Sequence, residues 1–187
     1  MDGRMNIHKT HIFGVMSVET TPFIDQRGSF SRWFCDDELS SIIDGRRIVQ
    51  VNHSCTRELG AVRGLHYQNP PYAEMKFIRC IRGRVWDVAV DVRADSPTYL
   101  QWHAEELSAE NQRMLVIPEG CAHGFQVLEE SSEMLYLHTE FYSREYEGGL
   151  RYSDPDLGIT WPLEPTDVSK RDRTHPFISE GFQGVVL

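Results

Sequence analysis

Basic residues, cysteine pairs and long apolar runs are scarce in this sequence, and each shortage excludes a class of protein. The 187 residues include 19 Lys and Arg against 28 Asp and Glu, which gives a formal net charge of −9. Because nucleic-acid binding normally requires a basic face, we expect no nucleic acid as the main partner. No stretch approaches the roughly 18 apolar residues that span a bilayer, and residues 1–16 lack the apolar core of a signal peptide. The sequence therefore predicts a cytoplasmic protein without a membrane partner.

The four cysteines are far apart and form no CxxC pair. They are Cys35, Cys55, Cys80 and Cys121. A chain of this length buries enough apolar surface to be stable without disulfides. Free cysteine is also among the residue types most often found in protein cores. We therefore expect four reduced thiols, most of them buried.

Short runs rich in Val, Ile, Phe, Trp and Tyr make up most of the chain, and Gly, Pro, Asn, Asp or Ser separate them. This pattern is typical of a β-sandwich or β-barrel. We expect one all-β domain over residues 1–187 with a few short helices, and no linker or internal repeat. The candidate strands are residues 11–19, 28–34, 47–54, 61–68, 74–81, 84–93, 99–107, 113–118, 122–129 and 133–142.

The strongest alternation lies in residues 84–93, where Trp86, Val88 and Val90 share one face of the predicted strand. Asp87 and Asp91 are on the other face, which must be polar or line a wet cavity. Helix signals are few. Asp36 or Asp37 is expected to cap a short helix over 37–43, and Ser169 a second one. The segment from about residue 153 is rich in Pro and Asp, and we expect it to wrap the β domain as an ordered tail.

Eight histidines raise the question of a metal site. Pro118, Gly120 and His123 match the PxGxxH spacing of the second cupin motif, which favours a double-stranded β-helix. The first cupin motif supplies a pair of histidines, but here His66 stands alone in RGLHYQ. Because a tight divalent site needs a complete set of His and carboxylate ligands, we predict no metal.

Proton-transfer chemistry fits the polar residues of the predicted strands better. Period two in residues 133–142 places Tyr136, His138, Glu140 and Tyr142 on one face, toward a barrel lumen. A neutral imidazole suits the removal of a proton next to a carbonyl, a cation stabilises the enolate oxygen, and a phenol returns a proton. Simpler interpretations remain open at this point, since tyrosines pack across strands, lysines lie on edge strands and histidines occur in cores.

One family combines these motifs in the same order. RGLHYQ, the Lys76 strand, GRVWDVAVDVR with SPTY, IPEGCAHGF, EMLYLHTEFY, DPDLGITWP and VSKRD together resemble the dTDP-4-dehydrorhamnose 3,5-epimerase family from about residue 11 to residue 175. The resemblance implies a cupin-type jelly roll without metal or cofactor. It also implies a homodimer that exchanges N-terminal strands. The implied reaction inverts C3 and C5 of dTDP-4-dehydro-6-deoxy-D-glucose to give dTDP-4-dehydro-L-rhamnose.

The resemblance also implies roles for individual residues. His66 is the base, Asp172 polarises it, Tyr136 is the general acid and Lys76 faces the C4 oxygen. Other residues are implied to bind the sugar, the diphosphate or the nucleotide of the substrate. Those that contact the nucleotide come from the neighbouring subunit. The implied binding residues are Gln50 and Asn52 for polar contacts, Arg63 for the diphosphate, His123 in the cavity, Tyr142 beside the sugar or base, and Arg27 and Phe30 for the neighbour's nucleotide.

Two positions depart from the family pattern. Arg32 stands where the family commonly has a Glu that reads the base. A guanidinium only donates hydrogen bonds, which matches cytosine or guanine better than thymine, unless Arg32 turns to solvent. Glu74 stands two residues before Lys76, where the family often has Gln, and its expected place is the surface.

Three other functions remain open on the sequence alone. A 3-epimerase, or a relative that acts on another nucleotide-linked 4-keto sugar, would use the same residues. A metal-dependent cupin such as a dioxygenase would require a bound metal ion. A sugar-binding jelly roll would have no turnover.

Overall fold

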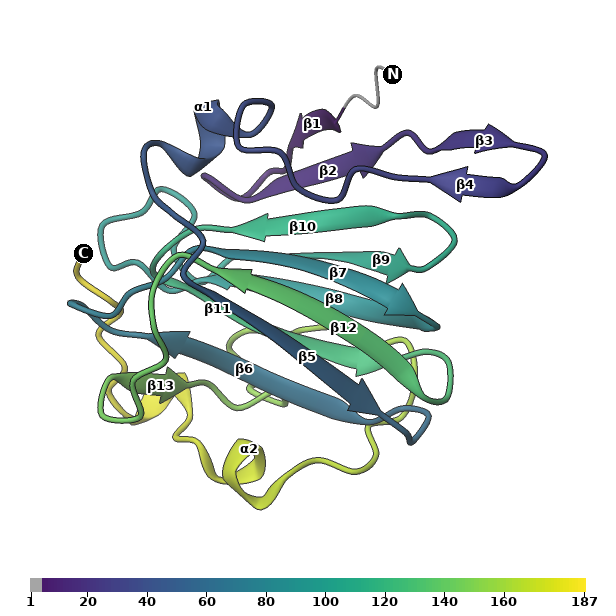
Figure 1. The fold of residues 1–187 in the computed structure, drawn as a ribbon. Coiled ribbons are helices and arrows are strands. Elements are labelled where there is room, and N and C mark those ends of the chain that lie inside the picture. The colour runs from purple at the N-terminus through teal and green to yellow at the C-terminus, as the bar shows by residue number, and fades with distance from the viewer. Residues whose placement is uncertain (1–4) are drawn as a thin grey trace.

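Two antiparallel sheets pack face to face and contain nearly all of the strands (Figure 1). The computed structural model describes residues 5–187. The six-stranded sheet has the order β1 (Met5–Lys9), β2 (Met16–Thr20), β10 (Arg113–Ile117), β7 (Lys76–Arg82), β12 (Ser132–His138) and β5 (Gln50–Thr56). The five-stranded sheet has the order β13 (Glu147–Gly149), β6 (Val62–Gln68), β11 (Cys121–Val127), β8 (Arg84–Asp91) and β9 (Trp102–Ser108).

From β5 onward the chain passes repeatedly from one sheet to the other. β5, β7, β10 and β12 belong to the six-stranded sheet, whereas β6, β8, β11 and β13 belong to the five-stranded sheet. This exchange between two facing layers is the double-stranded β-helix, or jelly roll. The prediction of an all-β, cupin-like jelly roll with few short helices is therefore confirmed.

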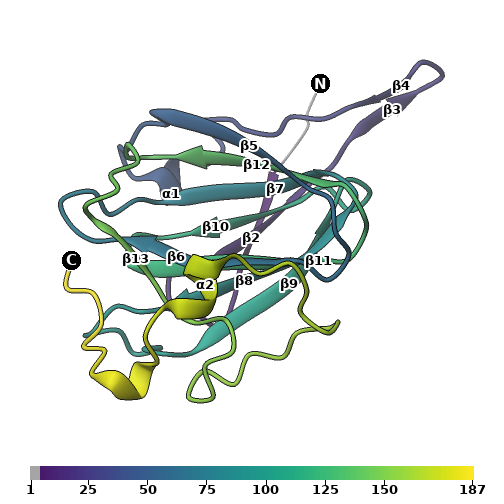
Figure 2. The ribbon, with the colours of Figure 1, turned by 90° about the horizontal axis from the view of Figure 1, so that it is seen from below.

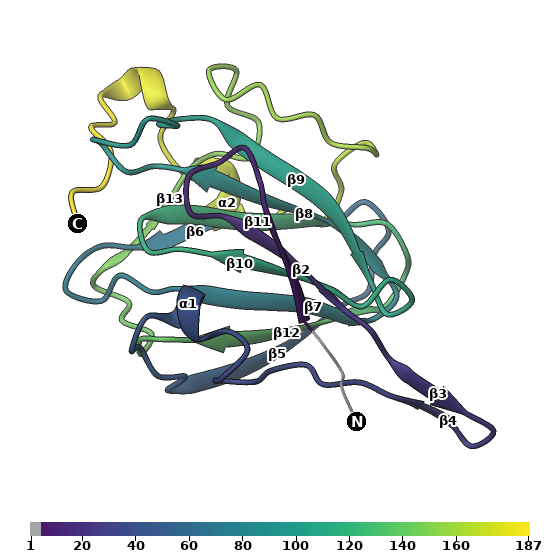
Figure 3. The same cartoon turned by 90° about the horizontal axis from the view of Figure 1, so that it is seen from above.

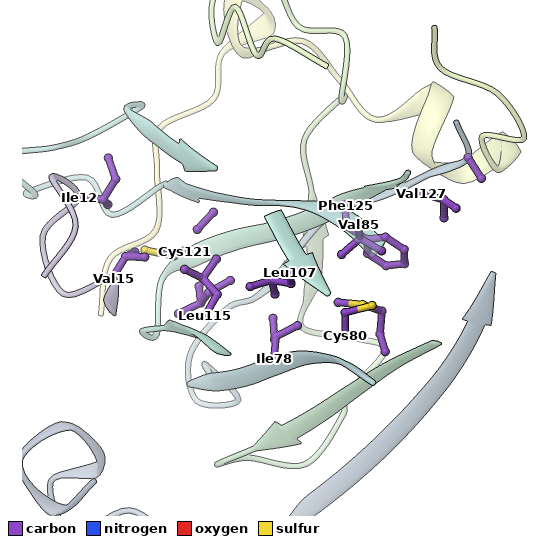
Figure 4. Close-up of a cluster of buried hydrophobic side chains, with 14 residues drawn as sticks. Ile12, Val15, Ile78, Cys80, Val85, Leu107, Leu115, Cys121, Phe125 and Val127 are labelled. Carbon is purple, nitrogen blue, oxygen red and sulfur yellow. The ribbon is translucent and has the colours of Figure 1, made fainter. Parts of the chain in front are cut away.

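The space between the sheets is filled by apolar side chains from both layers (Figure 4). β8 contributes Val85 and Ala89 to this core, while Trp86, Val88 and Val90 point to the opposite face of the sheet. The predicted alternation over residues 84–93 is thus confirmed. The inner face also carries the fully buried Asp87, so polar groups reach into the space between the sheets.

The outer face of each sheet is covered by a different part of the chain. The C-terminal segment lies along the five-stranded sheet, where the Trp102 indole donates to the Leu157 carbonyl at 3.0 Å and Val185 N to the Val92 carbonyl at 2.6 Å. The helix α1 (Ser40–Ile43) covers the six-stranded sheet with Leu39 and Ile43. Within residues 5–187, no helix has the length and apolar character needed to cross a membrane.

Several element boundaries differ from the sequence predictions. β1 was not predicted at all, and residues 11–14, expected to be extended, form a turn before β2. The α1 N-cap is Leu39, without a capping side chain, so the prediction of an Asp36 or Asp37 cap is wrong. The second prediction holds, because the Ser169 hydroxyl accepts a hydrogen bond from Asp172 N at 3.0 Å and caps α2 (Lys170–Thr174). A short 3₁₀ helix, η1 (Ile178–Glu180), follows.

A two-stranded hairpin projects from the body of the molecule (Figures 1 and 3). Its strands are β3 (Phe23–Asp25) and β4 (Gly28–Phe30), so the strand predicted over 28–34 is much shorter than expected. The hairpin exposes three large apolar side chains: Phe23 is 51% exposed, Ile24 72% and Phe30 66%. Such a concentration of exposed apolar surface is typical of a contact site for another molecule.

The cysteines are all free, as predicted, but their burial varies. Cys80 and Cys121 are buried, and burial raises the pKa of each thiol to about 12. Cys35 is half-buried. Cys55 is exposed on the edge strand β5, so the expectation of burial is wrong for this residue.

A glycine in β11 allows the close approach of β6. A Cβ atom on Gly124 would lie 2.8 Å from the Arg63 carbonyl oxygen and 3.2 Å from the Gly64 Cα. We expect Gly124→Ala to lower the free energy of unfolding by about 1 to 3 kcal/mol, because β6 has to move away. Urea denaturation measures this change. Glu110→Ala, in an exposed turn, is the control and should change it by less than about 0.5 kcal/mol; an equally small change for Gly124→Ala would refute the steric argument.

Candidate active site

A cavity of about 540 Å³ lies between the two sheets and is closed on one side by α2 and β13. Figure 2 shows α2 alongside β6. The lining is unusually polar for the interior of a β-sandwich, with histidines, carboxylates and cations from both sheets. The lining residues are Asn52, His53, Ser54, Arg63, His66, Tyr67, Gln68, Glu74, Lys76, His123, Phe125, Tyr136, His138, Tyr142, Glu147, Ser169, Arg171 and Asp172.

His66 and Asp172 meet at the edge of this cavity although they are far apart in the sequence. His66 Nε2 lies 2.8 Å from Asp172 Oδ1, and Asp172 Oδ2 accepts a hydrogen bond from Gly64 N at 3.2 Å. Burial opposes ionisation of this carboxyl, but the hydrogen bonds from His66 and Gly64 outweigh it and lower the pKa of Asp172 to about 2. The Asp172 carboxylate only accepts hydrogen bonds, whereas the Arg171 guanidinium, whose Nη2 lies 2.8 Å from the same Nε2, only donates them. A proton on Nε2 satisfies Asp172 and leaves the lone pair of a base on Nδ1.

Lys76 lies deep in the cavity, at the start of the interior strand β7. Its side chain is only 8% exposed, which excludes a lysine at the surface of an edge strand. The ammonium donates to the His66 carbonyl at 3.2 Å and lies 3.2 Å from Glu74 Oε1. Glu74 is itself buried, at 8% exposure, so its expected surface position is wrong. Burying an unpaired ammonium group costs on the order of several kcal/mol. The Glu74 carboxylate offsets this cost for Lys76.

Tyr136 lies on β12, next to the Lys76 strand β7 and in the sheet opposite to that of His66. Its hydroxyl lies 2.9 Å from Ser54 Oγ, and its ring packs against the core between the sheets. Burial raises the pKa of Tyr136 well above its usual value. The phenol therefore stays protonated at neutral pH and is available as a proton donor.

His123 forms a further couple with a carboxylate. Its Nε2 lies 2.8 Å from Asp87 Oδ2, and its ring stands edge-on to Tyr136 with centroids 6.1 Å apart. Burial raises the pKa of Asp87, partly offset by the neighbouring His123. Asp87 belongs to the polar face predicted for residues 84–93, and its role there is to orient His123 in the cavity.

The strand that carries Tyr136 is shorter than predicted. β12 ends at His138, so Glu140 does not continue its inner face and is absent from the cavity lining. Tyr142 reaches the cavity from the following loop, where its hydroxyl donates to Glu147 Oε2 at 3.0 Å. Of the predicted face, Tyr136, His138 and Tyr142 line the cavity.

The residues expected to bind substrate fall into two groups. Asn52, Arg63, His123 and Tyr142 line the cavity. Gln50, Arg27 and Phe30 do not line it. The Gln50 side chain accepts a hydrogen bond from Tyr142 N at 3.1 Å, while Arg27 and Phe30 are on the projecting hairpin, away from the cavity of their own chain.

Sequence reasoning missed several polar residues of this site. Arg171 contacts Glu147 at 2.9 Å and approaches His66 Nε2 to 2.8 Å. Because Arg171 directly precedes Asp172 in the sequence, its place in the site could have been inferred. Glu74 had a signal too, because period two before Lys76 places both side chains on one face. Ser54 and Glu147 had no such signal, since only the fold brings them to the cavity.

Three residues present ligand atoms close enough to hold a metal ion: His66, Asp172 and His175 lie within 4.8 Å of one another. The Arg171 guanidinium next to His66 Nε2 opposes a second cation there. His66 and His123, the two histidines in cupin motif positions, are each hydrogen-bonded to a carboxylate.

The sequence model of the dTDP-4-dehydrorhamnose 3,5-epimerase family matches residues 9–180. The chain belongs to this family. A dTDP-4-dehydrorhamnose 3,5-epimerase of Shigella flexneri is 45% identical over 170 residues, which are 90% of this chain and 93% of the relative. Membership of the dTDP-4-dehydrorhamnose 3,5-epimerase family makes this chain an isomerase that acts as a sugar epimerase.

Solved structures of the family have the same fold. The dTDP-6-deoxy-D-glucose-3,5-epimerase of Legionella pneumophila, in complex with dTDP-4-keto-L-rhamnose, superposes with a TM-score of 0.91 at 36% identity, covering 98% of this chain and 99% of that one. ChmJ of Streptomyces bikiniensis, a 3′-monoepimerase in complex with dTDP-quinovose, gives a TM-score of 0.88 at 31% identity, over 96% and 92% of the two chains. The family fold thus serves relatives that differ in the number of carbons they invert.

The lowered pKa of Asp172 makes the free energy of unfolding depend on pH. The substitution Asp172→Asn would remove this dependence. The pKa of Asp172 is about 2 in the folded protein against a usual 3.8, so the carboxylate stabilises the fold above about pH 4, and this contribution is lost as the pH falls to about 2. We expect Asp172→Asn to destabilise the protein at pH 7 and the difference from wild type to shrink at pH 3. Urea denaturation at both pH values tests this; an equal difference at both would contradict it.

Proposed function

We propose that this chain inverts C3 and C5 of dTDP-4-dehydro-6-deoxy-D-glucose and releases dTDP-4-dehydro-L-rhamnose. The observation that carries the proposal is the arrangement of base and acid on opposite walls. His66 belongs to β6 in the five-stranded sheet, whereas Tyr136 belongs to β12 in the six-stranded sheet. Inversion requires a proton to leave one face of a planar enolate and another to arrive at the opposite face. Two facing sheets supply that geometry.

The mechanism follows from the contacts of these side chains. His66 Nδ1 takes the proton from the carbon next to the C4 ketone, and Asp172 stabilises the imidazolium that forms. The Lys76 ammonium stabilises the negative charge that develops on the C4 oxygen. The Tyr136 phenol then donates its proton to the other face of the same carbon. The tyrosinate recovers a proton from solvent and the imidazolium releases one, and the cycle repeats at the second carbon.

The remaining lining residues suit the rest of the substrate. Arg63, whose Nη1 donates to Thr56 Oγ1 at 3.2 Å, provides a cation for the diphosphate. Asn52 and His123 provide polar contacts to the sugar. Tyr142, 54% exposed at the cavity mouth, provides an aromatic face for the sugar or base.

The projecting hairpin supports a homodimer that exchanges N-terminal strands. Arg27 and Phe30 lie outside the cavity of their own chain, and Phe30 is largely exposed. In a dimer, the hairpin would cover a partner's nucleotide. Sedimentation velocity tests this assembly, and Ile24→Asp, which places a charge on the exposed hairpin, should shift the protein toward monomer. A wild-type monomer at micromolar concentration would refute the dimer.

Proton NMR of the reaction in deuterated water tests the proposed function directly. We expect deuterium to enter at both C3 and C5. Exchange at C3 alone would make the chain a 3-epimerase, the activity that the name of ChmJ states for that relative. If the protein binds the nucleotide sugar but no deuterium enters it, the chain is a sugar-binding jelly roll without turnover. If turnover requires added metal, the chain is a metal-dependent cupin.

Arg32 is not expected to select the nucleotide base. Its guanidinium is paired with Glu38, which also accepts a hydrogen bond from Met5 N at 2.8 Å. We therefore expect calorimetry to give tighter binding of dTDP than of CDP or GDP, with dTDP affinity in Arg32→Ala within threefold of wild type. Arg47→Ala, at an exposed position, is the matched control. A preference for CDP or GDP that disappears in Arg32→Ala would assign the base contact to Arg32.

A further inference from the structure

Four histidines line the cavity, and each is hydrogen-bonded to a carboxylate: His53 to Glu133, His66 to Asp172, His123 to Asp87 and His138 to Glu74. The couples of His53 and His138 have no part in the proposed mechanism, and only that of His138 is buried. The couples of His66 and His123 are described above. In the buried couple of His138, Nδ1 lies 2.7 Å from Glu74 Oε2. Both side chains line the cavity, with Glu74 8% and His138 7% exposed. This couple is therefore built into the wall of the site.

The charge of Glu74 determines where the proton of His138 lies. Burial raises the pKa of the Glu74 carboxyl, but the neighbouring Lys76 and His138 outweigh burial and lower it below the usual value. Glu74 is therefore ionised and only accepts hydrogen bonds. Its neighbour Nδ1 must then carry a proton, so a neutral His138 keeps its lone pair on Nε2.

That lone pair faces the side-chain amide of Asn52. Asn52 Nδ2 lies 3.3 Å from His138 Nε2, across the paired strands β5 and β12. An NH₂ group donates and a lone pair accepts, so this contact fixes which end of the amide points to His138. The carbonyl oxygen of Asn52 is left for the cavity. Without the Glu74 carboxylate, the other tautomer of His138 would donate from Nε2 and turn the amide around.

We propose that Glu74 and His138 are positioning residues that hold the Asn52 amide with Oδ1 toward the substrate, where it accepts a hydrogen bond from a sugar hydroxyl. This inference rests on the proposed function and adds a specificity element to it. It requires a nucleotide-linked sugar that keeps a free hydroxyl near Asn52. We call the chain of contacts from Glu74 through His138 to Asn52 the relay. The binding of a nucleotide without a sugar does not depend on it.

The first test measures the tautomer of His138 in the protein without substrate. Long-range ¹H–¹⁵N NMR distinguishes protonated from unprotonated ring nitrogens, and the loss of signals in His138→Gln assigns them. We expect an Nδ1–H tautomer in the wild type at pH 7.5 and an Nε2–H tautomer in Glu74→Gln, where the amide can donate to Nδ1. An Nε2–H tautomer or an imidazolium in the wild type would overturn the proposal.

The second test measures the effect on a sugar that does not react. Calorimetry compares dTDP with dTDP-6-deoxy-D-glucose, which has no ketone. We expect Glu74→Gln to weaken the sugar nucleotide at least tenfold and to change dTDP affinity less than twofold. The control is Glu110→Gln, in an exposed turn outside the cavity lining, and it should leave both affinities unchanged.

Glu74 also contacts Lys76, so a double-mutant cycle separates the two routes. If Glu74 acts through Asn52, Glu74→Gln should change sugar-nucleotide affinity less than twofold in an Asn52→Ala background. A tenfold loss that persists in that background would assign the effect to Lys76 and overturn the relay. None of these measurements needs turnover. A wild type that binds dTDP-6-deoxy-D-glucose but gives no deuterium exchange would refute the epimerase mechanism alone.

Discussion

His66→Ala will lose both deuterium exchange and epimerisation, with the rate falling by about 10² to 10⁴-fold or more, the range that a positioned acid or base contributes. The physical reason is that His66, polarised by Asp172 at 2.8 Å, is the group placed to remove the carbon-bound proton. The rate is followed by proton NMR in deuterated water. The protein should still fold, with a lower free energy of unfolding, because Asp172 loses its hydrogen bond to the imidazole. The affinity for dTDP should be unchanged, because the proposed nucleotide contacts do not include His66.

The matched control for this variant is His8→Ala, a histidine at an exposed position on β1. It should retain the wild-type rate. Asp172→Asn should be affected less severely than His66→Ala, since it removes orientation and charge support but leaves the base. Activity of His66→Ala within threefold of the wild type would exclude His66 as the base.

Tyr136→Phe will separate the two proton transfers. We expect it to exchange the C3 hydrogen with solvent at close to the wild-type rate, because His66 still forms the enolate. Inverted product should fall by about 10²-fold or more, because the opposite face has lost its proton donor. The same NMR experiment measures both quantities in one sample.

Tyr152→Phe, outside the cavity lining, is the control and should leave both rates unchanged. Ser54→Ala should have an intermediate effect, because it removes the hydrogen bond at 2.9 Å that orients the Tyr136 hydroxyl. If Tyr136→Phe loses exchange as completely as His66→Ala, the phenol acts before or during deprotonation and its role as the final donor is wrong.

Local patterns predicted the fold where they were strong. Alternation over residues 84–93 identified β8, and the Ser169 cap identified α2. β1 was missed because MNIHK is short and mixed in polarity, and its strand conformation depends on pairing with β2. Leu39 caps α1 because the helix is only four residues long and is held by packing of Leu39 and Ile43 on the sheet.

The site was harder to predict from the residues alone. No local rule relates His66 to Asp172, 106 positions later in the chain, and only the family resemblance implied their pairing. Glu74 shows the opposite problem. Its spacing from Lys76 was visible, but a charged residue is normally exposed, and only the contacts with Lys76 and His138 explain its burial.

The place of α2 near the end of the chain has a consequence for biosynthesis. All strands that form the two walls of the cavity, apart from β13, have been made once residue 138 is added, yet His66 acquires its carboxylate only with residue 172. A nascent or truncated chain that stops between these points therefore lacks the partner of its base and part of the segment that covers the outer face of the five-stranded sheet. The order of synthesis thus delivers most strands of the cavity walls first and the carboxylate that polarises the base among the last residues of the chain.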